Sequence, residues 1–317
     1  NMDKCWRLTS FFPFRNNRIY GTSERFYKHR IKMIIRKTIW PRTLSDFCSM
    51  IFILTIVPLI YWFELWVVLP ALYNYNTIPY FVHFIMGNFI MLNIVGNFTY
   101  TVLCDTSINR TIVPVSTASS KNGWRLCATC EILAPPRSWH CSTCGTCILK
   151  RDHHCIFTGC CIGYFNHRYF LMFLLYLFVA TIYAFCYNNY FIWARINFEF
   201  PMSIIKIIFP LAIFVFGFDG SVEQFYLLLY IVSVVGMLFT GVLCIYHFRL
   251  VLSGCVADES NKNRYTYDLG WRQNMKEVLG ERWFLTWLIP YIKSQLPHDG
   301  ITWDTKSTWR INNAKSK

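Results

Sequence analysis

The sequence predicts an α-helical polytopic membrane protein with four transmembrane helices and a small zinc-binding, cysteine-rich cytosolic domain between helices two and three. Three observations lead to this fold class. The composition is 54% hydrophobic and 15% charged, which is too apolar for a soluble chain of 317 residues. Four runs of about twenty residues carry almost no charge. Eight of the 14 cysteines fall between Cys127 and Cys161.

The apolar runs divide the chain into five consecutive segments. Each run is long enough to cross a bilayer as a helix, and the runs cover residues 46–69, 79–104, 169–192 and 224–247. The predicted segments are a basic N-terminal segment (1–44), helices one and two (45–104), the cysteine-rich domain (105–168), helices three and four (169–247) and a C-terminal tail (248–317).

A fifth apolar run, residues 203–218, lies in the connection between the third and fourth helices. It is short, carries Lys206 near its start and contains Pro210, which interrupts a helix. We therefore expect this connection to be interfacial or re-entrant and not to span the membrane.

The distribution of lysine and arginine orients the helices. Eleven of these residues precede residue 45, seven lie between the second and third runs and eleven follow the fourth, whereas the other two connections carry none and two. The positive-inside rule therefore places both termini and the central domain in the cytosol. The endoplasmic reticulum or Golgi membrane is the expected location. The net charge of +14 reflects orientation and attraction to anionic lipid, so the lipid bilayer is an expected partner and nucleic acid is not.

The central domain contains the pattern CxxCx9Hx6C twice, with the second copy shifted by fourteen residues. In a reducing cytosol this density of cysteines favours metal ligation over disulfides. Three sulfurs and one imidazole suit a closed tetrahedral zinc site. We therefore expect two structural zinc ions in interleaved sites that fold together, held by Cys127, Cys130, His140 and Cys147 and by Cys141, Cys144, His154 and Cys161.

Three cysteine and histidine side chains of the domain remain outside the zinc sets: His153, Cys155 and Cys160. A zinc site with three thiolates has a negative formal charge, so the metal does not lower the pKa of Cys155. An adjacent imidazole is therefore needed to lower that pKa. We expect His153 to act as general base toward the Cys155 thiol, and Asp152 to fix the tautomer of the imidazole. Cys160 is expected to be a buried structural thiol, and an additional acylation site is the alternative.

The central domain resembles that of the DHHC-type protein S-acyltransferases, the palmitoyltransferase family. The matching stretches are "CATCEILAPPRSWHCSTCGTC", "LKRDHHCIFTGCCIGYFNHRYF" and, at residues 267–280, "YDLGWRQNMKEVLG", in which Asn274 matches a structurally important asparagine. The resemblance implies a protein-cysteine S-palmitoyltransferase. A long-chain acyl group would pass from acyl-CoA, such as palmitoyl-CoA, to Cys155. It would then pass to a cytosolic cysteine of a membrane-associated protein substrate.

The phosphates of CoA need cations, and the nearest in sequence are Arg137, Lys150, Arg151 and Arg168. Arg137 is the expected contact, and a solvated charge or a contact with a lipid headgroup is the alternative for each. The resemblance also implies that Ala180 occupies the position on the third helix that helps to close the far end of the acyl pocket. Two elements depart from the family pattern: Ile156-Phe157 replaces Pro-Trp after the Asp-His-His-Cys tetrad, and residues 256–259, "VADE", replace Thr-Thr-x-Glu. The second departure leaves open whether this element contacts the active-site domain.

Two other functional classes are alternatives to an enzyme. A catalytically inert zinc-bearing membrane scaffold is the main alternative, but such a scaffold has no need to keep the Asp-His-Cys set. A transporter with a cytosolic regulatory zinc domain is the second. A transporter needs ionisable residues at mid-membrane, whereas Glu64 and His83 lie near the non-cytosolic ends of their predicted helices.

Overall fold

The computed structural model describes residues 34–108, 123–195, 199–217 and 219–309. Most of the predicted basic N-terminal segment, residues 109–122 of the predicted cysteine-rich domain and the end of the predicted tail lie outside the described residues.

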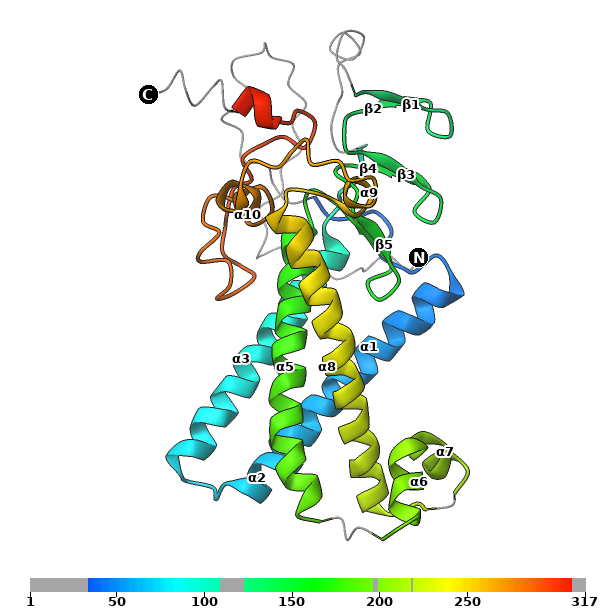
Figure 1. Cartoon of the computed structure of the whole chain (residues 1–317), viewed down its shortest axis with the longest axis vertical. Helices are drawn as coiled ribbons and strands as arrows, with labels where there is room; N and C mark the ends of the chain where they lie inside the picture. The colour runs from blue at the N-terminus through cyan, green and yellow to red at the C-terminus, as the bar shows by residue number, and fades with distance from the viewer. Residues whose placement is uncertain (1–33, 109–122, 196–198, 218, 310–317) are drawn as a thin grey trace, which may run out of the picture. The chain divides into compact units, whose positions relative to one another are not determined.

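Four helices in the described part of the chain are long and apolar enough to cross a membrane. The first, α1 (Leu44–Trp62), continues through the π-helical η2 (Phe63–Val68) into α2 (Leu69–Leu72). The other three are α3 (Ile78–Leu103), α5 (His167–Trp193) and α8 (Val222–Leu252) (Figure 1). Because the cysteine-rich segment lies between α3 and α5, this arrangement confirms the predicted fold class.

Short polar side chains set the start of three of these helices. The hydroxyl oxygens of Thr43, Thr77 and Ser221 each accept a hydrogen bond from a backbone N–H in the first turn of α1, α3 and α8, respectively. These bonds satisfy N–H groups that have no partner inside the helix.

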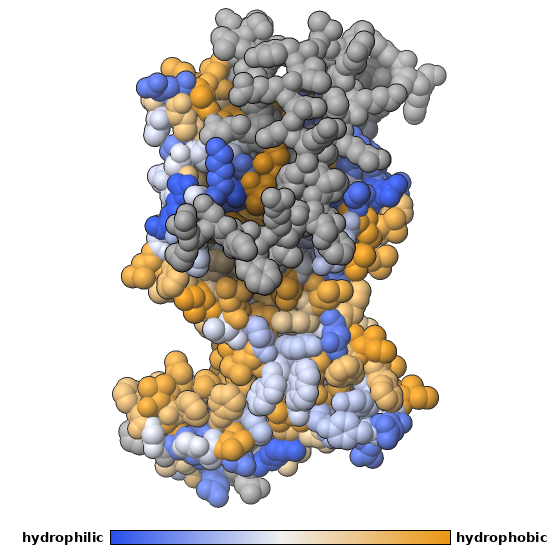
Figure 2. Space-filling model, turned by 180° about the vertical axis from the view of Figure 1, so that it is seen from behind, coloured by the Kyte–Doolittle hydropathy of each residue, from blue (hydrophilic) through white to orange (hydrophobic). Residues whose placement is uncertain are grey.

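The outer surfaces of the helices are largely apolar. Side chains such as Ile85 and Val242 are exposed, and Figure 2 shows apolar residues over much of one face of the molecule. An apolar surface of this extent is unfavourable in water and compatible with lipid, in which the helical backbone satisfies its own hydrogen bonds. The chain is therefore a multi-pass membrane protein.

Helix α5 packs against both α3 and α8. Phe173 of α5 contacts a buried cluster that includes Ile90 and Ile94 of α3. On the α8 side, Leu174 of α5 shares a second cluster with Cys244. The second cluster also contains Cys155, so the apolar packing of the helices reaches the cysteine-rich domain.

Helix α8 continues to Leu252, past the apolar run that ends at residue 247. Its last turns carry Val251, which packs with Met275 and Val278 of α10 (Trp271–Leu279). This contact buries apolar surface of α10, whose other face is polar, and so extends α8 beyond the length that its own hydropathy indicates.

The connection between α5 and α8 contains two short helices, α6 (Met202–Ile208) and α7 (Pro210–Val215) (Figure 1). Pro210 begins α7, where its missing N–H is tolerated, and the chain bends at Phe209. With seven and six residues, neither helix is long enough to cross a bilayer.

The described part of the cysteine-rich domain contains three antiparallel β-hairpins at the end of the helices where α3 finishes and α5 begins (Figure 1). The strands are β1 (Arg125–Cys127), β2 (Ile132–Ala134), β3 (Trp139–Cys141), β4 (Thr146–Ile148), β5 (His153–Cys155) and β6 (Cys160–Ile162). Each strand has only three residues, so hydrogen bonding within a hairpin is insufficient for stability and further cross-links are needed.

Candidate active site and metal centres

The two-residue period of the hairpins separates the two predicted metal sets. Side chains alternate between faces along a strand, and directly paired residues share a face. In β3, His140 pairs with Cys147, while the next residue, Cys141, faces the opposite side. In β5, His154 pairs with Cys161 in the same way. Adjacent residues therefore belong to different sets, which explains how overlapping patterns form two sites.

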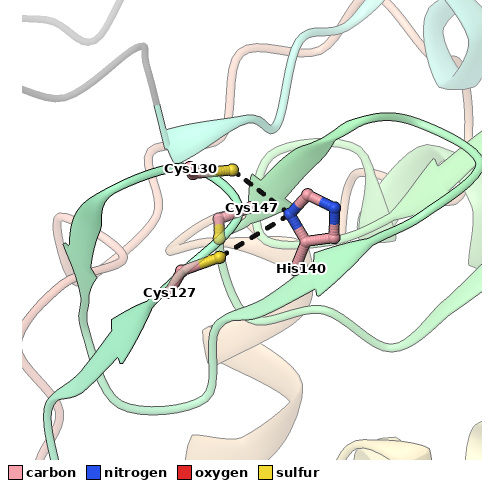
Figure 3. A group of neighbouring side chains, drawn as sticks. All are labelled: Cys127, Cys130, His140 and Cys147. Carbon is pink, nitrogen blue, oxygen red and sulfur yellow. Dashed lines mark hydrogen bonds between the residues drawn. The ribbon is translucent and has the colours of Figure 1, made fainter.

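The first set gathers at the β1–β2 turn and the β3–β4 hairpin. Its four ligand atoms lie within 4.8 Å of one another. Nδ1 of His140 is 3.7 Å from Sγ of Cys127 and 3.2 Å from Sγ of Cys130. Figure 3 shows these side chains and Cys147 converging on one point.

The second set joins the β3–β4 turn to the β5–β6 hairpin. Nδ1 of His154 is 3.7 Å from Sγ of Cys141, 3.4 Å from Sγ of Cys144 and 3.7 Å from Sγ of Cys161. The sulfurs of Cys144 and Cys161 are 3.7 Å apart. A tetrahedral zinc ion separates its nitrogen and sulfur ligands by about 3.6 Å and two sulfurs by about 3.8 Å, so these residues fit that ion.

The predicted catalytic residues meet on the opposite face of β5. Nδ1 of His153 lies 2.7 Å from Oδ2 of Asp152, and the imidazole is close enough to the Cys155 thiol to lower its pKa. Because Nδ1 is directed at the carboxylate, Nε2 is the nitrogen left for the thiol. Cys155 is only 7% exposed. The structure therefore brings carboxylate, imidazole and thiol together in the order that a triad requires.

The electrostatics of this set favour an ionised thiol. Burial raises the pKa of Cys155, but the hydrogen bond and charge of His153 outweigh it and bring that pKa below its usual value. Burial lowers the pKa of His153, whereas its bonds to Asp152 and Cys155 raise it to about 9. Burial also opposes ionisation of Asp152, yet the hydrogen bond from His153 holds its pKa below the usual range. The arrangement stabilises a thiolate beside an imidazolium.

The segment that departs from the Thr-Thr-x-Glu pattern contacts the active site through its backbone. The N–H of Ala257, at the start of α9 (Ala257–Asn261), donates to Oδ1 of Asp152 at 3.0 Å. Glu259 accepts two hydrogen bonds from Arg137, at 2.8 and 2.7 Å. The contact that the sequence left open is therefore present without either threonine.

Arg137, the predicted CoA contact, has several partners within the protein. It is 4% exposed, is paired with Glu259, donates to the carbonyl of Gly254 at 2.8 Å and stacks on Tyr267 and Trp303. A guanidinium held in this way joins the cysteine-rich domain to the C-terminal segment. This geometry gives no support to a contact with a CoA phosphate.

Two residues near these sites were not predicted from the sequence. His247 of α8 is buried, with Nδ1 3.4 Å from Oδ2 of Asp152 and its ring 5.0 Å from the ring of His153. Asp46 of α1 lies beside His154. Each lies at the end of a long apolar run, and the sequence carries no spacing that connects it to residues more than ninety positions away.

The surroundings of Cys155 are apolar. It packs in a buried cluster with Phe170, Leu174 and Cys244, and Phe157 borders this cluster. Phe157, which stands where the family has tryptophan, also makes an edge contact with Phe239 of α8 at 5.9 Å. The thiol therefore lies where the polar domain meets the apolar helices.

Cys160 lies on the same face of the β5–β6 hairpin as Cys155. It is buried, and its thiol is 3.7 Å from the carbonyl of Thr101 and 3.5 Å from the hydroxyl of Thr158. These contacts agree with the structural role that was expected of it.

Comparisons with known proteins agree with these features. A family model described as DHHC palmitoyltransferase matches residues 120–264. The chain is 35% identical to the probable palmitoyltransferase ZDHHC24 of Danio rerio, over 72% of this chain and 77% of the relative. It is 34% identical to the human protein of that name, over 69% and 77%. It is 32% identical to the palmitoyltransferase ZDHHC21 of Pongo abelii, over 72% and 88%. This chain belongs to the DHHC palmitoyltransferase family.

Proposed function

We propose that Cys155 carries the acyl group in this chain, which by family membership is a protein S-acyltransferase. The observation that carries the proposal is the Asp152, His153 and Cys155 set: Nδ1 of His153 is bonded to Asp152, and the imidazole lowers the pKa of the Cys155 thiol, on the strand face away from the metal sets. We assign Asp152 and His153 the roles of orienting carboxylate and general base.

The reaction has two steps. In the first, the Cys155 thiolate attacks the carbonyl carbon of an acyl-CoA thioester, the carbon–sulfur bond to CoA breaks, and the CoA thiolate takes the proton held by His153. In the second, a substrate cysteine gives its proton to His153 and attacks the acyl-enzyme, and Cys155 leaves as a thiolate beside the protonated His153, which restores the starting state. One thioester replaces another in each step, so no energy source is required.

The setting of Cys155 supports a long-chain acyl group as the cargo. A thiol at the junction of a polar domain and apolar helices allows the chain to lie among apolar side chains while CoA remains in water. Burial contributes about 0.8 kcal/mol for each methylene, so a sixteen-carbon chain gains strongly from such a site. Membrane-associated proteins with a cysteine at the cytosolic face are the proposed substrates.

We assign zinc to both metal sets. The donor chemistry of three thiolates and one imidazole, together with the ligand separations in the second set, supports this ion. Bound zinc would cross-link the short hairpins and hold β5 in place. The residues proposed to hold it are the eight that the repeated pattern predicts.

The proposed orientation places both termini and the hairpin domain in the cytosol, in an endoplasmic reticulum or Golgi membrane. The counts of lysine and arginine on either side of the four helices support this orientation.

Acylation of the purified full-length protein tests the assignment of Cys155. Incubation with an alkyne-tagged palmitoyl-CoA is expected to label the protein through a bond that hydroxylamine cleaves. Cys155→Ser is expected to abolish the label while zinc content and melting temperature stay unchanged, and Cys186→Ser, at an exposed thiol on α5, serves as the matched control. Labelling of Cys155→Ser at the parent rate would contradict the assignment.

A further inference from the structure

The carboxylate of Asp46 faces the second metal set from the first turn of α1. Both of its oxygens lie 3.3 Å from Nε2 of His154, and the residue is 1% exposed. Asp46 is also fixed by its own backbone, because its N–H donates to the hydroxyl of Thr43 at the start of the helix. A buried carboxylate is costly unless it is paired, and His154 is the partner that the structure gives it.

The geometry of His154 defines what this partnership does. Nδ1 is directed at three sulfurs, at 3.4 to 3.7 Å, and is therefore the nitrogen available to a metal. Nε2 must then carry the proton, which it donates to Asp46. A carboxylate in this position fixes the tautomer and the ring orientation and makes the imidazole a stronger ligand.

The first metal set lacks a matching partner within the described part of the chain. Nδ1 of His140 faces the sulfurs of Cys127 and Cys130. Among the described residues, no hydrogen bond joins Nε2 of His140 to a carboxylate. The two sets have the same donors and the same spacing, so one serves as an internal control for the other.

The segment before α1 adds further contacts with the second set. Arg36 is 3.5 Å from the carbonyl of Gly159 in the β5–β6 turn. The side chain of Arg42 lies against Gly145 in the β3–β4 turn, where an added Cβ would be 3.1 Å away from it. Asp46, Arg36 and Arg42 thus connect the start of α1 and the segment before it to both hairpins of this set.

We propose that Asp46 is the outer partner of the metal ligand His154, and that it retains zinc selectively in the second set while fastening α1 to that site. The inference rests on the proposed zinc occupancy and is independent of acyl transfer. It makes Asp46 a positioning residue, which acts on the metal through His154.

The experiment compares the zinc-loaded full-length parent with Asp46→Asn, which removes the charge and keeps an acceptor, and with Asp46→Ala, which removes both. Each protein is challenged with a chromogenic zinc chelator, and cysteines freed over time are alkylated and identified by mass spectrometry. Zinc release from the second set is expected to accelerate roughly 10-fold or more in Asp46→Ala and less in Asp46→Asn. Cys141, Cys144 and Cys161 should be alkylated before Cys127, Cys130 and Cys147.

Asp258→Asn, at a half-exposed carboxylate paired with Lys262, is the matched control and should release zinc at the parent rate. Equal acceleration at both sets, or no acceleration in either Asp46 variant, would overturn the proposal. If Asp46→Ala does not fold, the isosteric Asp46→Asn decides the result. A parent without zinc in its second set would contradict the metal assignment itself, whereas a loaded parent with unchanged release in the variants contradicts only the role of Asp46.

Discussion

His153 and His154 are consecutive residues with opposite surroundings. The strand period directs His153 toward Asp152 and the apolar helices, and directs His154 toward three sulfurs and Asp46. Neighbours with such different partners should fail differently when each is replaced.

His153→Ala is expected to keep its fold and both zinc ions but to acylate on the order of 100-fold more slowly, because the thiol loses its base. The rate should recover partly as pH rises and the thiol ionises unaided. His154→Ala should instead lose about one zinc per chain and melt at a lower temperature. Zinc content, melting temperature and acylation rate, measured on both variants, test this.

The opposite result would reverse the assignment of the two histidines. If His153→Ala drops a zinc while His154→Ala keeps both, the pairing of β5 with β6 does not describe the active protein.

His247 is expected to hold the carboxylate of Asp152 in place. His247→Leu removes the nitrogen 3.4 Å from Oδ2 of Asp152 and should slow acylation on the order of 10-fold at unchanged zinc content. His247→Asn, whose amide N–H is able to donate from nearly the same position, should restore part of the rate. A purely packing role predicts the reverse order, since leucine fills the apolar site better than asparagine.

Residue spacing predicted the two metal sets and the Asp-His-Cys set because each lies within one short segment. It did not predict His247 or Asp46, since their partners come from other elements. Nor did it predict the ion pair of Arg137 with Glu259, which lies 122 positions away in the sequence.

At the scale of elements, α5 packs against both α3 and α8, and its faces have different partners. Leu174 faces α8 and the region of Cys155, whereas Ala180 borders the cluster formed with α1 and α3.

Ala180→Tyr is expected to shift the preference of the enzyme toward shorter acyl chains, because a bulky ring fills space at the far end of the proposed acyl pocket. Competition among acyl-CoAs of 14, 16 and 18 carbons measures the shift. Val179→Tyr, at an exposed neighbouring position, is the control and should leave the preference unchanged. An unchanged preference in Ala180→Tyr would contradict this placement.

Apolar run length predicted the four long helices, because a bilayer demands about twenty residues from each. It did not predict the π-helical η2, where Glu64 accepts a hydrogen bond from Asn188 of α5 at 2.6 Å. Nor did it predict the extension of α8, which depends on α10. Both features come from contacts between elements that are distant in sequence.

At the scale of the whole molecule, the hairpin domain is expected to depend on the proposed zinc ions. Its three hairpins have strands of three residues and only small apolar clusters, so zinc would supply on the order of 10 kcal/mol to its folding. The helices carry their own hydrogen bonds and apolar contacts, and they do not share this dependence.

Complete removal of zinc is expected to release two ions per chain and to unfold the hairpins while the helices persist. Limited proteolysis should then cut within residues 123–165, and circular dichroism should retain most of its helical signal. A metal-free protein whose hairpins remain protected from protease would contradict the structural role of zinc.

The proposed orientation predicts which connections face away from the cytosol. A flexible insert that carries a glycosylation sequon, placed after Gly220 between α7 and α8, should be glycosylated in microsomes. The same insert placed after Lys306 should not be. Glycosylation of the second insert and not the first would invert the topology.

The bond between α9 and the catalytic carboxylate has a consequence for how the sequence can diverge. Its donor is the main-chain N–H of Ala257, a group that every amino acid except proline supplies. The threonines of the family pattern are therefore dispensable for this bond, and the bond does not depend on which side chain stands at position 257. The bond requires only that the backbone keeps its course at this position. A comparison of amino-acid sequences, which sees side chains alone, would therefore count this contact as lost although the structure retains it.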